Sequence, residues 1–125
     1  MWVREWIARR KKLGLSNNFL AETKQEDPSA FKTFLRLDAG MFDQLFQIVQ
    51  PFIAKNDTFF REAIPAKIKL EISLAYLTTG CSFGMLEACC RVPKSTISRF
   101  LIPVLQAISY VLRDHLKVIY YILYE

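Results

Sequence analysis

The side chains of this chain that are best suited to chemistry follow one another between Lys94 and Arg99, in the segment KSTISR. Hydroxyl and basic side chains near the start of a helix can donate hydrogen bonds to phosphates and to base edges in the major groove of DNA. The segment therefore points to nucleic-acid binding. The side chains that we expect to face outward are Lys94, Ser95, Thr96, Ser98 and Arg99.

The elements that must position these side chains are two short helices between Gly80 and Leu101, with the apolar spacing of a helix-turn-helix. In this motif the helices pack through a few fixed apolar positions. A helical hairpin in an ordinary core has similar spacing and remains the alternative. The positions that we expect to pack the pair are Leu86, Cys90, Val92, Ile97 and Phe100.

Three residues depart from the common pattern of the motif. Arg91 stands where glycine is usual, Glu87 where a small residue is usual, and Pro93 where a serine or threonine often caps the second helix. The larger side chains at 87 and 91 must swing outward or widen the crossing of the helices.

Basic residues are also concentrated at the N-terminus, where residues 1 to 12 contribute +4 to a net charge of +5. Such a run can neutralise phosphates, act as a nuclear import signal, or simply solvate one face of a helix. In the DNA-binding hypothesis, the cations that join the outward set are Arg9, Arg10, Lys11, Lys12 and Arg91.

Residues for catalysis or metal binding are missing from the pattern. Cys81, Cys89 and Cys90 fit neither a disulfide framework nor the spacing of a zinc site, and His115 is distant from them. We expect no metal and no cofactor, and buried, reduced thiols. No signal peptide and no run of roughly 20 apolar residues is visible, so we expect no membrane partner.

Apolar residues spaced three and four apart, with few glycines and prolines, predict an all-α fold. We expect one domain over residues 1–125, a compact orthogonal bundle of about six or seven helices. The expected segments are a basic N-terminal helix at 1–13, short helices from 19 and from Pro28, a central helix after the cap Asp38 with a kink or break at Pro51, a helix from Pro65 to Gly80, the helix-turn-helix-like segment 80–101, and a terminal helix at 103–123. Pro103 should limit the recognition helix to about two turns.

Several segments in order resemble the N-terminal region of PIF/Harbinger-type transposases and of the Harbinger transposase-derived nucleases. They are WVREW at 2–6, EDPSAFKTFLRLDAGMFDQL at 26–45, REAI at 61–64, LEISLAYLTTGCSF at 70–83 and RVPKSTISRFL at 91–101. The resemblance covers roughly residues 2 to 117.

In that family this region precedes a metal-dependent nuclease domain that carries Asp, Asp and Glu. The present chain diverges at about Val118 and ends at Glu125, so we expect a truncated form without that domain, and no enzyme activity. Two-metal chemistry needs carboxylates that converge from rigid elements, whereas the acidic residues here are scattered. The resemblance also implies a nuclear location, and a cytoplasmic location in addition remains open.

Two functions remain open. The first is a DNA-binding module, which would need a homodimer or a partner because one short helix makes few base contacts. The second is a protein-interaction module that docks the Myb-like protein encoded beside such transposases, and a non-functional transposon remnant is a further alternative. Aromatic residues that the core could leave uncovered favour the second: Phe19, Phe59, Phe60, Tyr120, Tyr121 and Tyr124.

Overall fold

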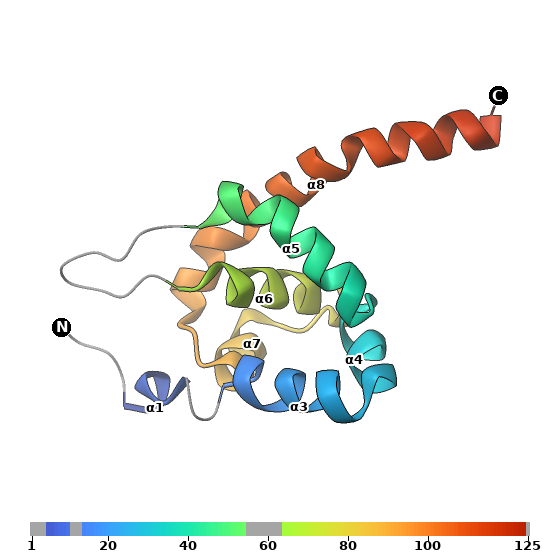
Figure 1. Ribbon diagram of the computed structural model, residues 1–125. Coiled ribbons are helices and arrows are strands. Elements are labelled where there is room, and N and C mark those ends of the chain that lie inside the picture. The colour runs from blue at the N-terminus through green and yellow to red at the C-terminus, as the bar shows by residue number, and fades with distance from the viewer. Residues whose placement is uncertain (1–4, 11–13, 55–63, 125) are drawn as a thin grey trace.

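A computed structural model describes residues 5–10, 14–54 and 64–124, with side chains up to Arg113 except at positions 6 and 7. The described residues form helices and no strands, which confirms the predicted all-α class. Six helices pack together (Figure 1): α3 (Ala21–Glu26), α4 (Pro28–Leu35), α5 (Ala39–Ile53), α6 (Ala66–Thr79), α7 (Phe83–Cys90) and α8 (Lys94–Tyr124).

The N-terminal part is less regular than the sequence predicts. Helix α1 is described over Glu5–Ala8, and the remaining ends of the predicted helix 1–13, residues 1–4 and 11–13, lie outside the described residues. A single π-helical turn, η1 (Ser16–Leu20), leads directly into α3. The short helix expected from residue 19 therefore begins three residues earlier.

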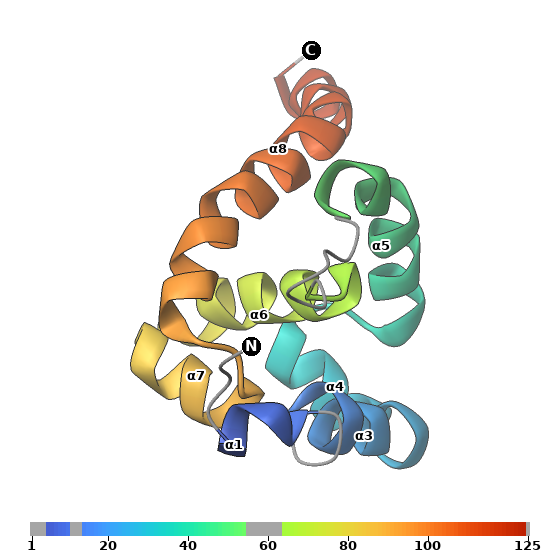
Figure 2. The same cartoon turned by 90° about the vertical axis from the view of Figure 1, so that its left-hand side faces the viewer.

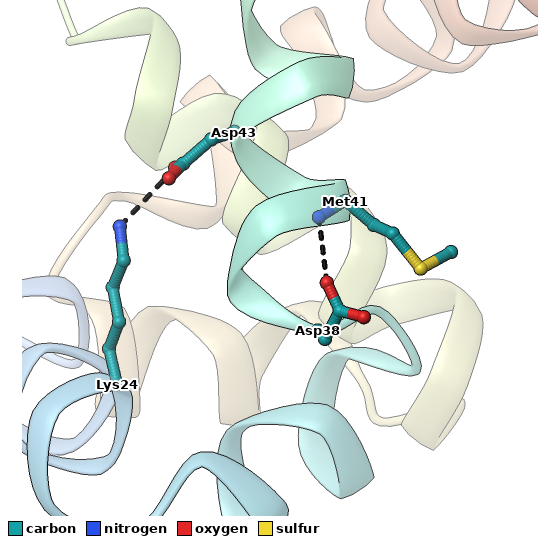
Figure 3. A network of polar contacts seen from close by, with 4 residues as sticks. All are labelled: Lys24, Asp38, Met41 and Asp43. Atoms are coloured by element: carbon teal, nitrogen blue, oxygen red, sulfur yellow. Dashed lines mark hydrogen bonds and ion pairs between the residues drawn. The ribbon is translucent and has the colours of Figure 1, made fainter.

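Several helix ends lie where the sequence predicts them. Asp27 accepts a hydrogen bond from the Ala30 amide (3.2 Å), and Pro28 is the first residue of α4. Asp38 accepts from the Met41 amide at 2.8 Å and begins α5 (Figure 3). Gly80 ends α6 in the left-handed conformation, with φ at 66°. Short polar side chains satisfy the free amides of a first helical turn, and glycine tolerates positive φ.

The central helix is α6, and the expectation that α5 is central was wrong. Seven consecutive residues of α6, Lys69 to Ala75, are buried, and α4, α5 and α8 pack around it (Figures 1 and 2). The sequence hides this role because Lys69, Glu71 and Ser73 are polar. Helix α5 instead buries one face and leaves Met41, Ile48 and Phe52 exposed.

The buried Lys69 is compatible with the core because its charge has an acceptor. Its Nζ donates a hydrogen bond to the carbonyl oxygen of Ile53, the last residue of α5, at 3.0 Å. A cation is stabilised at the C-terminus of a helix, where the final carbonyl groups lack helical partners. Lys69 therefore fastens the end of α5 to α6.

The helix end predicted at Pro103 is wrong, and of the two outcomes predicted at Pro51, a kink or a break, the break does not occur. Helix α5 continues through Pro51 to Ile53, and α8 runs from Lys94 through Pro103 to Tyr124 as one helix of 31 residues. Proline removes one backbone hydrogen bond and crowds the preceding turn, which bends a helix more readily than it ends it when packing holds both sides. Val104 and Ile108 are buried beyond Pro103, and Figure 2 shows α8 bending along its length. The residues predicted to form a separate helix at 103–123 are thus the continuation of α8.

Candidate nucleic-acid interface

Helices α7 and α8 form the pair that the apolar spacing predicts. They are joined by three residues, Arg91 to Pro93, and they pack against each other. All the side chains expected to hold the pair together are buried: Leu86, Cys90, Val92, Ile97 and Phe100. The polar segment KSTISR therefore lies on the first turns of a helix whose opposite side is fixed in the core.

Arg91 takes the backbone conformation of the glycine that it replaces. Its φ and ψ are 57° and 44°, in the left-handed region, and its amide donates to the Glu87 carbonyl at 2.9 Å. An L-residue in this region costs about 1–2 kcal/mol relative to a right-handed conformation. The close turn is thus preserved, and the departure from glycine appears as backbone strain rather than as a wider turn.

Glu87 and Pro93 act together at the start of α8. Pro93 accepts backbone hydrogen bonds from Thr96 and Ile97 at 2.9 and 3.0 Å, but it has no side-chain oxygen to cap the helix. Glu87 supplies one instead, because its Oε1 accepts from the Lys94 amide at 3.3 Å. The large side chain at 87 therefore swings to the N-terminus of α8, where a carboxylate is favoured by the helix dipole.

The predicted outward residues of α8 lie on its solvent side. Lys94, Ser95, Ser98 and Arg99 are exposed, and Thr96 is half-buried. Three of these side chains, Ser98, Arg99 and Thr96, are engaged locally. The Ser98 hydroxyl donates to the Ser95 carbonyl at 2.9 Å, and the Arg99 guanidinium lies 3.5 Å from the Thr96 hydroxyl. A ligand on this face would meet both cations directly and would have to turn the Ser98 hydroxyl.

The chain after the basic N-terminal run packs against the end of α7. The Leu15 amide donates to the Cys89 carbonyl at 3.1 Å. At Gly14 a Cβ would stand 2.6 Å from the Arg10 carbonyl oxygen and 3.3 Å from that of Cys90, so a side chain there would not fit. These contacts place Arg10 near Cys90, the last residue of α7 before the turn that leads to α8.

The remaining N-terminal cations contribute unequally. Arg9 is exposed and pairs loosely with Glu5, with 3.8 Å between Nη1 and Oε1. Lys11 and Lys12 lie outside the described residues. Arg10 and Arg91 are both partly buried near the end of α7. The N-terminal run and the helix pair are separate features of the sequence, and the fold brings Arg10 to the pair.

Two residues of this surface were absent from the sequence-based set. Glu87 was noted only as a departure from the motif, although an acidic residue seven positions before Lys94 can reach a helix N-terminus after a short turn. Ile102 is 56% exposed and follows Ser98 by one helical turn on α8. Its helical spacing from Ser98 could have shown that the outward face continues past the polar segment.

The cysteines are only partly as expected. All are free, but Cys89 is exposed and Cys81 half-buried, so the prediction of buried thiols is right for Cys90 alone. Burial raises the pKa of the Cys90 thiol to about 12. Within the described residues, no group of His, Cys, Asp and Glu side chains could hold a metal ion.

Helix α8 is apolar enough to be compared with a membrane-spanning helix. By length and composition, Lys94–Arg113 could cross a bilayer, with a mean hydropathy of 1.3 and 28% of the window buried. Ile97, Phe100 and Val104 of this window belong to the core. One such helix among the described residues is weak evidence for a membrane span.

No protein-family model, no curated protein and no solved structure matches this chain. The geometry of the α7–α8 pair and its surroundings is therefore the basis for a functional proposal.

Proposed function

We propose that this chain is a DNA-binding helical module, in which the first turns of α8 enter the major groove. The observation that carries the proposal is the arrangement of α8, whose exposed Lys94, Ser95, Ser98 and Arg99 stand opposite a buried apolar side. A recognition helix needs this combination, since one side must be fixed while the other reaches base edges and phosphates.

Each residue has a role that follows from its chemistry. Arg99 can form a bidentate contact to a guanine edge, and Lys94, at the start of the helix, can bind a phosphate. Ser95 and Ser98 are short enough to lie near base edges. Arg10 and Arg91 add attraction that does not depend on sequence, because they stand beside the turn.

The proposed module agrees with the resemblance to the N-terminal region of Harbinger-type transposases. On this basis we infer that the present chain is located in the nucleus and does not itself catalyse a reaction. A single short helix offers few base contacts, so we expect low affinity for one copy and a need for a second copy or a partner.

The test is fluorescence anisotropy with a labelled duplex over a salt series. The variant is Lys94→Glu with Arg99→Glu, and its matched control is Lys32→Glu with Arg36→Glu, which changes the net charge equally at exposed positions on and after α4. The proposal predicts that the wild type binds the duplex, that the Lys94 and Arg99 variant loses affinity, and that the control variant loses clearly less affinity. Equal losses would show attraction by net charge alone, and no binding by the wild type at low salt would reject the proposal.

A second candidate is a protein-interaction module, supported by an apolar face between α5 and α8. Ile48, Phe52 and Tyr110 are about half exposed or more, and the Phe52 and Tyr110 rings lie 5.8 Å apart. Exposed aromatic and aliphatic groups that adjoin one another favour association. Phe19 is also exposed, at 42%, while the other aromatic residues named for this role lie outside the described side chains.

The two candidates separate by mutation. Phe52→Ser with Tyr110→Ser should leave DNA affinity unchanged if DNA binding is the function. If instead these changes abolish co-purification of a Myb-like partner while the Lys94 and Arg99 pair leaves it intact, docking is the function.

A further inference from the structure

Glu71 is a buried acid in the middle of the central helix that the proposed function does not use. It is 3% exposed, and its Oε1 has no hydrogen-bond partner among the described residues. Buried polar atoms in folded proteins are almost always paired with protein groups or ordered water. This oxygen therefore needs a partner.

Protein groups supply only part of what the carboxyl group needs. Ser16 in η1 forms a hydrogen bond with it, and the charges of Lys67 and Lys24 act on it from nearby. Lys24 is engaged elsewhere, since its Nζ lies 3.2 Å from Oδ1 of Asp43 on α5 (Figure 3). Burial nevertheless outweighs these effects and raises the pKa of Glu71.

Glu71 lines two small cavities, each partly open to solvent and with room of about 10 Å³. One lies toward Lys24 and Lys67, and the other toward Arg10, Ser16 and Cys90. Room of about 10–15 Å³ holds a single water molecule, provided that polar groups are within reach. Both cavities are thus the size of one water, and both contain the carboxyl group that lacks a partner.

We propose that Oε1 of Glu71 is hydrogen-bonded to an ordered water molecule in one of these flanking cavities. Water suits the site because it can donate to a carboxylate and accept from a carboxylic acid. The bridge connects α6 with the segment around η1 and α3, which carries Ser16 and Lys24. It is a structural water site behind the turn that precedes α8, and it stands whether or not the chain binds DNA.

The direct test is a crystal structure of the whole chain at a resolution that shows ordered water. A water peak within hydrogen-bond distance of a Glu71 carboxyl oxygen, in either cavity, is the expected result. Two dry cavities would overturn the proposal, and so would a carboxyl group bonded entirely to protein donors.

Two variants test the same point in solution. Glu71→Gln keeps the polar atoms that hold the water, while Glu71→Met has a similar shape and cannot hold it, and neither carries a charge. Both variants are compared in a Ser16→Ala background, so that the hydrogen bond from Ser16 is absent from each. The proposal predicts that the glutamine variant melts at a temperature about 4 °C higher than the methionine variant, the shift produced by one net hydrogen bond in a domain of this size. If the methionine variant is equally or more stable, Oε1 has no bound water.

Discussion

The strained turn at Arg91 allows stability and binding to be changed in opposite directions by one substitution. Arg91 and Arg36 are the non-glycine residues with positive φ among those described, at 57° and 64°. Arg91 precedes α8 and belongs to the proposed interface, whereas Arg36 joins α4 to α5. Replacing each with glycine therefore removes the same strain in two different settings.

The expected gain follows from the backbone geometry. The left-handed conformation costs an L-residue about 1–2 kcal/mol, and glycine avoids this cost. Glycine also gives the unfolded chain more conformational freedom, which destabilises the folded chain by about 0.4–1 kcal/mol. The net stabilisation is roughly 0.5–1 kcal/mol, or an increase of about 2–4 °C in the melting temperature for a domain of this size.

Both variants should thus melt at higher temperature than the wild type in differential scanning calorimetry. In DNA binding they should differ, because only Arg91→Gly removes a cation from the proposed interface. For Arg91→Gly, the slope of log K against log salt should become shallower by about 0.9, the value for one phosphate contact. Arg91→Lys keeps the charge and the strain, so it should match the wild type in both measurements.

Two results would refute this reasoning. If Arg36→Gly stabilises the chain and Arg91→Gly destabilises it, the Arg91 side chain contributes packing or polar contacts that exceed the strain. If Arg91→Gly and Arg36→Gly bind DNA with the same affinity and salt dependence, Arg91 does not contact the ligand.

Three further predictions follow from single side chains. Glu87→Gln removes a negative charge at the start of α8, so it should raise DNA affinity at low salt by roughly twofold to fivefold in anisotropy titrations, and unchanged affinity would place the ligand elsewhere. Because burial raises the folded-state pKa of Glu71 above its ordinary value of 4.5, its stabilising effect is complete below that value and is lost as the pH rises through the folded pKa. The free energy of unfolding should therefore decline from mildly acidic pH upward, and Glu71→Gln should decline less, whereas identical pH profiles would contradict a raised pKa. Finally, a thiol reagent at neutral pH should modify the exposed Cys89 in the native protein and spare Cys90, whose pKa is about 12, and mass spectrometry that finds Cys90 modified first would show that this end of α7 opens.

The sequence predicted most of the helix boundaries because local capping chemistry determines them. Asp38 and Gly80 begin and end their helices as expected, since each satisfies backbone groups within its own turn. The burial of Leu86, Val92 and Ile97 was predictable for a similar reason, because a helical period places them on one side.

The errors come from long-range packing. Helix α6 is central although it contains Lys69 and Glu71, because the Ile53 carbonyl and the small cavities accommodate these groups, and no local pattern reveals them. Pro103 lies inside α8 because contacts on both sides hold the helix together. The position of Arg10 beside the turn depends on a hydrogen bond between residues far apart in sequence, Leu15 and Cys89.

The most direct test of the central claim is an NMR titration of the isotopically labelled chain with a short DNA duplex at low salt. The account predicts that amide shifts cluster at the start of α8, at Lys94, Ser95, Ser98 and Arg99, with weaker changes at Arg91. The absence of shifts, or shifts confined to the apolar face around Phe52 and Tyr110, would contradict it.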